Sequence, residues 1–144
     1  SNPYVKNAQV VVMDKAAAPD YDAVELLRTL TFAVEAGSAG EAELKAMDIP
    51  GITSVQSQSS ALMEVAAGTA NACVIDITMA NAMTGEGTGY PNLTIAQELS
   101  SEEYGIGFRK DSDLTAKVND IMAELMADGT LDALAAKYSL TLVK

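Results

Sequence analysis

One stretch constrains the fold of this chain more than any other, because residues 30–47 combine a strand, a glycine turn and a helix start in direct succession. The first six of these residues alternate in the manner of a pleated strand, and small apolar residues on both faces predict that the strand is buried. Gly37 then interrupts the strand. Ser38 and Glu41 form an S-x-x-E capping box, so we expect a helix from Ala39 to Met47.

This turn predicts a small-anion site. We expect the backbone N–H groups of Ser38, Ala39 and Gly40 to be free, since a helix start leaves its first amides without intrahelical acceptors. Together with the positive end of the helix dipole, such amides attract a carboxylate or a phosphate. The alternative is a well-capped turn that binds nothing.

A second strand-and-helix unit repeats the plan. Ser57–Ala67 has a helical apolar face that ends at a glycine, and Asn71–Asp76 reads as a buried strand. Ligands of parallel α/β sheets bind beyond the carboxyl ends of the strands, so the glycine turn and Asp76 could face one pocket. Asp76 could equally cap a helix over Thr78–Met83.

The remaining pattern predicts further strands and helices around these two units. The expected strands are Ala8–Met13, Leu93–Ala96 and Glu103–Lys110, and the expected helices are Tyr21–Arg28, 112–127 and Leu131–Tyr138. Gly105 and Gly107 would let the third of these strands bend as a hinge. The helix over 112–127 carries an apolar stripe formed by Leu114, Val118, Ile121, Met122 and Leu125. The glycine-rich segment Thr84–Pro91 lacks a lysine and follows no strand, so it predicts a surface loop and no phosphate-binding loop.

Charge and residue types exclude several function classes. The chain has 20 acidic and 9 basic residues, and its net charge of −11 repels nucleic acid and anionic lipid. It has no histidine and one cysteine, Cys73, which argues against a disulfide scaffold and against His- or Cys-based metal and catalytic sites. Cys73 lies in an apolar run and is expected in the core. We therefore predict no metal, no cofactor and no catalytic residue.

No leader sequence and no apolar run of about 20 residues is visible, so we expect a cytosolic protein or a trimmed, mature piece of a longer one. The strand that opens the chain almost at once suggests that an upstream part is left out.

Four segments in this order carry a family resemblance: PYVKNAQVVV, TFAVEAGSAGEAELK, SQSSALMEVAAGTANACVIDI and EEYGIGFRKDSDLTAKVNDIMAELMADGTLDALAAKY. Nearly the whole chain resembles the second half of an extracellular solute-binding protein for polar amino acids, the substrate-binding component of an ABC transporter. The resemblance implies an α/β fold of the type II periplasmic-binding-protein class. It would have a central, largely parallel sheet, an antiparallel hinge strand and flanking helices. The implied domain is a single lobe with its core over 14–103, hinge strands at 4–13 and 104–110, and C-terminal helices at 111–144, without the first lobe.

The resemblance also implies a ligand site. Its residues would be Glu35, Gly37, Ser38, Ala39, Gly40, Gln58 and Asp76. The turn would bind the α-carboxylate of an amino acid and Asp76 its α-ammonium, while Glu35 and Gln58 would tune selectivity or simply be solvated. Ala39 stands where relatives often have a hydroxyl residue, so only its backbone N–H could serve. The arginine and aromatic contacts that relatives take from the first lobe are missing.

The implied function is to capture a polar amino acid outside the cytoplasm, in the extracellular space or periplasm, and to deliver it to a membrane permease. The full-length form could be anchored as a lipoprotein. A sensory ligand-binding domain and, on the same fold, a dehydratase are the alternatives, and for an enzyme the only candidate acid–base pair is Asp76 with Glu35. Without the first lobe, the apolar stripe would lose its cover, which favours a homodimer of this piece. The alternative is a monomer whose helices fold back onto their own sheet.

Overall fold

The computed structural model describes residues 1–143, which divide into two compact units. We call Ala8–Ser101 the sheet unit. The terminal unit consists of Ser1–Asn7 and the chain from Glu102 onward. Each unit is described by itself.

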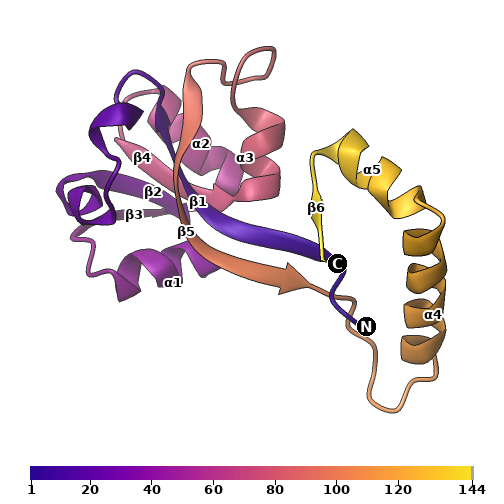
Figure 1. The fold of residues 1–144 in the computed structure, drawn as a ribbon. Helices are drawn as coiled ribbons and strands as arrows, with labels where there is room; N and C mark the ends of the chain where they lie inside the picture. The colour runs from indigo at the N-terminus through magenta and orange to yellow at the C-terminus, as the bar shows by residue number, and fades with distance from the viewer. Residues whose placement is uncertain (144) are drawn as a thin grey trace. The chain divides into compact units, whose positions relative to one another are not determined.

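The sheet unit is built on a mostly parallel sheet with the strand order β3-β2-β4-β1-β5 (Figure 1). Its strands are β1 (Val5–Asp14), β2 (Thr31–Glu35), β3 (Gly51–Val55), β4 (Ala72–Asp76) and β5 (Leu93–Tyr104). β2 is parallel to both β3 and β4, whereas β1 is antiparallel to β4. The expected fold class, a largely parallel sheet with an antiparallel strand and flanking helices, is confirmed.

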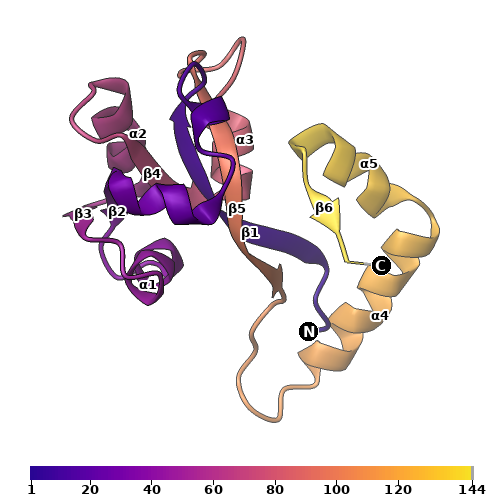
Figure 2. The same cartoon turned by 60° about the vertical axis from the view of Figure 1, so that its left-hand side comes forward.

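Helices cover both faces of this sheet (Figures 1 and 2). They are α1 (Ala39–Ala46), α2 (Gln58–Ala66) and α3 (Ile77–Met83). Along β1, Val11 and Met13 belong to the core cluster that contains Leu44 of α1, whereas Val10 belongs to the cluster that contains Leu62 of α2. Successive residues of a strand point to opposite faces, so one apolar run fills two cores. Cys73 is fully buried in the α2 cluster, as expected.

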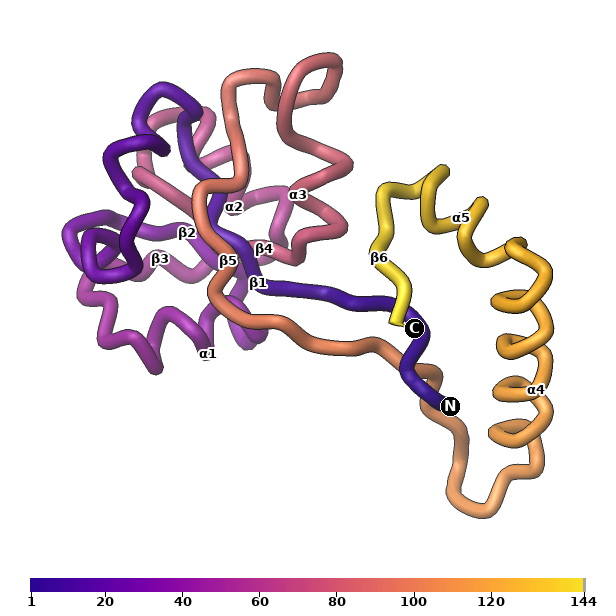
Figure 3. The backbone as a smooth tube through the Cα atoms, in the orientation of Figure 1, coloured from indigo at the N-terminus to yellow at the C-terminus, as the bar shows by residue number. Residues whose placement is uncertain are grey.

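Two expected elements differ in the structure. The strand expected at 103–110 is absent, and β5 runs without interruption from Leu93 to Tyr104 (Figure 3). Its second half is polar and shows no apolar alternation, but β5 is a hydrogen-bonded neighbour of β1 in the sheet, and such pairing can supply the backbone partners that a polar strand needs. The helix expected at Tyr21–Arg28 is replaced by two short 3₁₀ helices, Ala18–Asp20 and Val24–Thr29. Such tight turns are frequent as connectors.

The terminal unit contains α4 (Leu114–Ala127), α5 (Thr130–Tyr138) and β6 (Thr141–Leu142). β6 pairs antiparallel with the start of β1. None of the 14 residues of α4 is buried, although the helix carries the apolar stripe predicted from the sequence. Across the described residues 1–143, no helix has the length and apolar character needed to cross a membrane.

Candidate ligand-binding site

The candidate site lies at the edge of the sheet where β2, β3 and β4 end. Because β2 runs parallel to both neighbours, the three carboxyl ends share this edge, and α1, α2 and α3 each begin directly beyond them. This is the edge at which parallel sheets bind ligands. The sequence-based expectation that the glycine turn and Asp76 lie at the same edge is therefore met.

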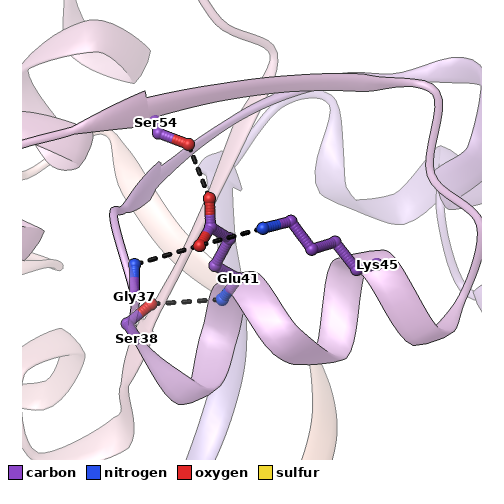
Figure 4. A network of polar contacts seen from close by, with 5 residues as sticks. All are labelled: Gly37, Ser38, Glu41, Lys45 and Ser54. Carbon is purple, nitrogen blue, oxygen red and sulfur yellow. Dashed lines mark hydrogen bonds and ion pairs between the residues drawn. The ribbon is translucent and has the colours of Figure 1, made fainter.

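The start of α1 is held by a network of polar contacts (Figure 4). Gly37 adopts the left-handed conformation, with φ +75°, and ends β2. The Ser38 hydroxyl accepts a hydrogen bond from the Glu41 amide at 3.1 Å, and the Glu41 carboxylate accepts one from the Gly37 amide at 3.0 Å. Glu41 also accepts from the Ser54 hydroxyl at 2.6 Å and pairs with Lys45 at 3.1 Å. The capping box is confirmed, and its return bond reaches Gly37.

This network lowers the pKa of Glu41 from 4.5 to about 2, chiefly through the Ser54 hydroxyl, then through the Gly37 amide and Lys45. The carboxylate therefore remains ionised and keeps the turn closed at every pH near neutrality.

The network also decides which backbone amides remain for a ligand. The Gly37 amide is used by Glu41, and the Ser38 amide donates to the Glu35 carbonyl at 3.2 Å. The expectation of a free Ser38 amide is thus wrong, because this amide closes the turn through its hydrogen bond to the Glu35 carbonyl. For the amides of Ala39 and Gly40, the structure of residues 1–143 shows no acceptor. Two amides at the positive end of α1 can still bind an anion.

Asp76 lies at the end of β4, before α3, and its side chain makes no capping bond. Its carboxylate instead accepts one hydrogen bond from the Gln9 side chain at 2.6 Å and another from the Gln58 side chain at 2.8 Å. Gln58 also accepts from the Asp76 amide at 3.0 Å, so the two residues are joined twice. Position left two roles open, a helix cap and a residue of a ligand pocket; the structure shows no capping bond and a carboxylate held by two side-chain amides.

Gln9 was missed in the sequence analysis. It is only 3% exposed on β1, directly opposite Asp76 in the antiparallel pairing of β1 with β4. The available signal was a single amide side chain inside the apolar run from Ala8 to Met13, because a buried amide needs a hydrogen-bond partner.

Gly40, at the start of α1, lies close to Val74 and Gln9. A Cβ atom at Gly40 would lie 2.7 Å from Val74 Cγ1 and 3.1 Å from Gln9 Oε1. The helix therefore approaches the sheet more closely than any side chain would allow. Gln9 therefore bonds to the Asp76 carboxylate and also lies close to Gly40, one of the two residues whose amides show no acceptor.

Glu35 ends β2 at the same edge but starts from the other face of the sheet. Alternate residues of a strand share one face of the sheet. Glu35 therefore shares the face of Ala33, which packs in the core cluster that contains Leu62 of α2. Asp76 shares the face of Val74, which packs in the core cluster that contains Leu44 of α1. The pairing of Val34 with Val74 fixes this relation, so the two carboxylates start from opposite faces of the sheet. This separation does not favour an acid–base pair.

The arrangement suits a zwitterion. Two amides at a helix N-terminus can bind a carboxylate, and an oriented aspartate nearby can bind an ammonium group. Among residues 1–143, no group of three or more Asp, Glu or Cys residues is placed to hold a metal ion.

Comparisons with known proteins give a matching family model and several similar solved structures. The family model for bacterial extracellular solute-binding proteins, family 3, matches residues 1–141. Among curated proteins, nothing matches. A mutant of ArgBP from T. maritima is similar in structure, with a TM-score of 0.78 and 34% identity, over 96% of this chain and 60% of that one.

Two further solved structures are similar. An amino acid ABC transporter substrate-binding protein from Streptococcus pneumoniae, bound to L-arginine, has 25% identity and a TM-score of 0.75 over 99% of this chain and 61% of that one. An ancestral amino acid-binding protein, a precursor of cyclohexadienyl dehydratase, has 26% identity and a TM-score of 0.79 over 96% of this chain and 60% of that one. The chain spans about 60% of the length of these three proteins.

Proposed function

Because this chain belongs to the bacterial extracellular solute-binding proteins, family 3, we propose that it is one lobe of a protein that captures a polar amino acid for an ABC transporter. The observation that carries the proposal is the contact of Gln9 with both Asp76 and the start of α1. The contact supports the proposal because Asp76 could bind the ammonium group of an α-amino acid and the amides at the start of α1 its carboxylate. The family supports a periplasmic or extracellular location. A lipid anchor is a further proposal.

The test is isothermal titration calorimetry of the intact two-lobed protein with the standard amino acids. Arginine comes first, because the S. pneumoniae neighbour is bound to L-arginine. We expect Asp76→Ala to weaken binding by about 2–5 kcal/mol, as for a buried charge pair that loses one member. Glu86→Ala removes the same charge from an exposed loop and should leave binding unchanged. Wild-type affinity in Asp76→Ala would refute the assignment.

Affinity should depend on the missing part of the protein. A single wall of a binding site cannot exclude water or surround a ligand, so we expect the 144-residue chain to bind amino acids at best in the millimolar range. An NMR titration that gave a micromolar Kd would contradict this expectation. Turnover of any substrate would instead support the dehydratase alternative.

Delivery to a permease is the step that separates transport from sensing. Deleting the gene should abolish uptake of the radiolabelled ligand, and an Asp76→Ala allele should not restore it. If uptake were normal in the deletion strain while a ligand-dependent response was lost, the sensory alternative would replace the transport proposal.

We also propose that the 144-residue chain by itself forms a homodimer through α4. Two side chains of its apolar stripe are largely exposed: Leu114 is 49% exposed and Ile121 is 53% exposed. Burying several such side chains contributes about 1.5–3 kcal/mol each. Sedimentation equilibrium at tens of micromolar should show a dimer that Ile121→Asp dissociates and Ala123→Asp, on the same helix, does not. A monomer mass for the wild type would refute the proposal.

A further inference from the structure

A buried glutamine on β1 does more than fill the core of the sheet unit. Gln9 is 3% exposed between the apolar residues Ala8 and Val10, where a hydrocarbon side chain would pack without any polar group. Burying an amide is unfavourable unless its donors and acceptor are used. The position of Gln9 therefore calls for a reason in its contacts.

Its amide group donates to Asp76 Oδ1 at 2.6 Å, and Gln58 donates to Asp76 Oδ2 at 2.8 Å. Since an ionised carboxylate only accepts hydrogen bonds, the nitrogen of the Gln9 amide must be the atom that faces it. The two donors come from β1 and α2 and hold one oxygen each, which fixes the plane of the carboxylate. Both donors are neutral amides, so they orient the carboxylate without neutralising its negative charge.

The other end of the same amide group borders α1. Gln9 Oε1 lies 3.1 Å from the point that a Cβ atom at Gly40 would occupy. The Gln9 side chain thus donates to Asp76 and lies close to Gly40 at the start of α1, where the amides of Ala39 and Gly40 show no acceptor.

We propose that Gln9 is the positioning residue of the ligand site. It orients the Asp76 carboxylate and sets its separation from the start of α1, and thereby matches the site to the short spacing of ammonium and carboxylate in an α-amino acid. The role in ligand binding rests on the proposed function, whereas the orientation of Asp76 is measurable without any ligand.

The first experiment uses the 144-residue chain and no ligand. The side-chain carboxyl carbon of Asp76 is followed by NMR over pH in the wild type and in Gln9→Met, which keeps the length of the side chain and removes the donor. Losing a hydrogen bond that favours the charged form should move the titration midpoint of Asp76 up by about one pH unit. The matched control is Gln97→Met, the same change at a glutamine that donates to the Tyr21 carbonyl at 2.7 Å. An unchanged midpoint in Gln9→Met overturns the proposal.

The second experiment uses Gln9→Glu, in case Gln9→Met does not fold. A protonated glutamic acid has the shape of glutamine and can donate to Asp76, whereas an ionised one repels it. The affinity of the intact two-lobed protein for the amino acid found by calorimetry is measured over pH for wild type and Gln9→Glu. As the pH is lowered and the new carboxyl is protonated, we expect the ratio of the Gln9→Glu affinity to the wild-type affinity to rise at least tenfold. A purely structural role of Gln9 would give parallel pH profiles for the two proteins, and that result would overturn the proposal.

A double-mutant cycle separates this inference from the proposed function. Gln9→Met should weaken amino-acid binding about tenfold in the wild-type background and have almost no further effect in an Asp76→Asn background, because the two residues act as one unit. Equal effects in both backgrounds would show that Gln9 acts independently of Asp76. If the intact wild type bound no amino acid while the ligand-free titration of Asp76 still responded to Gln9→Met, the proposed function would fail and the positioning of Asp76 would stand.

Discussion

Substituting Gly40 with alanine should destabilise the sheet unit, although the same change stabilises most helices. In an unobstructed helix, alanine is more favourable than glycine by about 1 kcal/mol. At Gly40 the new methyl group would lie 2.7 Å from Val74 Cγ1, a distance that real Cβ atoms essentially never show. Val74 is 1% exposed and β-branched, so its side chain has little freedom to move away from the new methyl group.

Overpacking of this kind costs about 1–3 kcal/mol and outweighs the gain in helix propensity. After the gain of about 1 kcal/mol is subtracted, we expect a net loss of up to about 2 kcal/mol in the free energy of unfolding, measured by urea denaturation with an unchanged m-value. Gly89→Ala is the matched control in the same unit, because no atom lies within 4 Å of the added Cβ and its φ is not positive. It should change stability by less than about 0.5 kcal/mol.

The clash itself can be isolated with Val74→Ala. If the Val74 methyl groups are the obstacle, Gly40→Ala should cost less in the Val74→Ala background than in the wild type, with a coupling energy of at least about 0.5 kcal/mol. A Gly40→Ala protein that is more stable than the wild type would refute the close approach of α1 to the sheet, and with it the closeness of Gly40 to Gln9.

Three further predictions concern the same unit. The folded-state pKa of Glu41, about 2, lies below its ordinary value, so the contribution of its carboxylate to stability should be complete above about pH 4.5 and lost as the pH falls towards 2. The difference in unfolding free energy between wild type and Glu41→Gln should therefore shrink over this range, and a constant difference would contradict the prediction. Ser38→Ala removes the acceptor of the Glu41 amide and should cost about 0.5–2 kcal/mol in urea denaturation, which an unchanged midpoint would exclude. Burial raises the pKa of the Cys73 thiol to about 12, so a thiol reagent at pH 8 should label the protein only in denaturant, and rapid labelling of the native chain would show that Cys73 is accessible.

The sequence by itself determined the local elements of the site. Gly37, Ser38 and Glu41 lie within five positions of one another, and their capping interactions need no contact with a distant part of the chain. The buried strands β2 and β4 were equally predictable, because apolar runs bounded by turn residues have few alternatives. The resemblance to a family then assigned Asp76 and Gln58 to the site, but with no relation between them.

Only the tertiary structure decided how these parts meet. Gln9 and Asp76 are 67 positions apart, and their contact follows from the antiparallel pairing of β1 with β4. The register of β2 against β4 puts Glu35 on the opposite face from Asp76. Pairing with β1 accompanies a β5 strand that continues through a polar stretch, which the sequence left undefined. Strand pairing and side-chain hydrogen bonds depend on partners that are distant in the chain, and a periodic pattern contains no information about which partner is chosen.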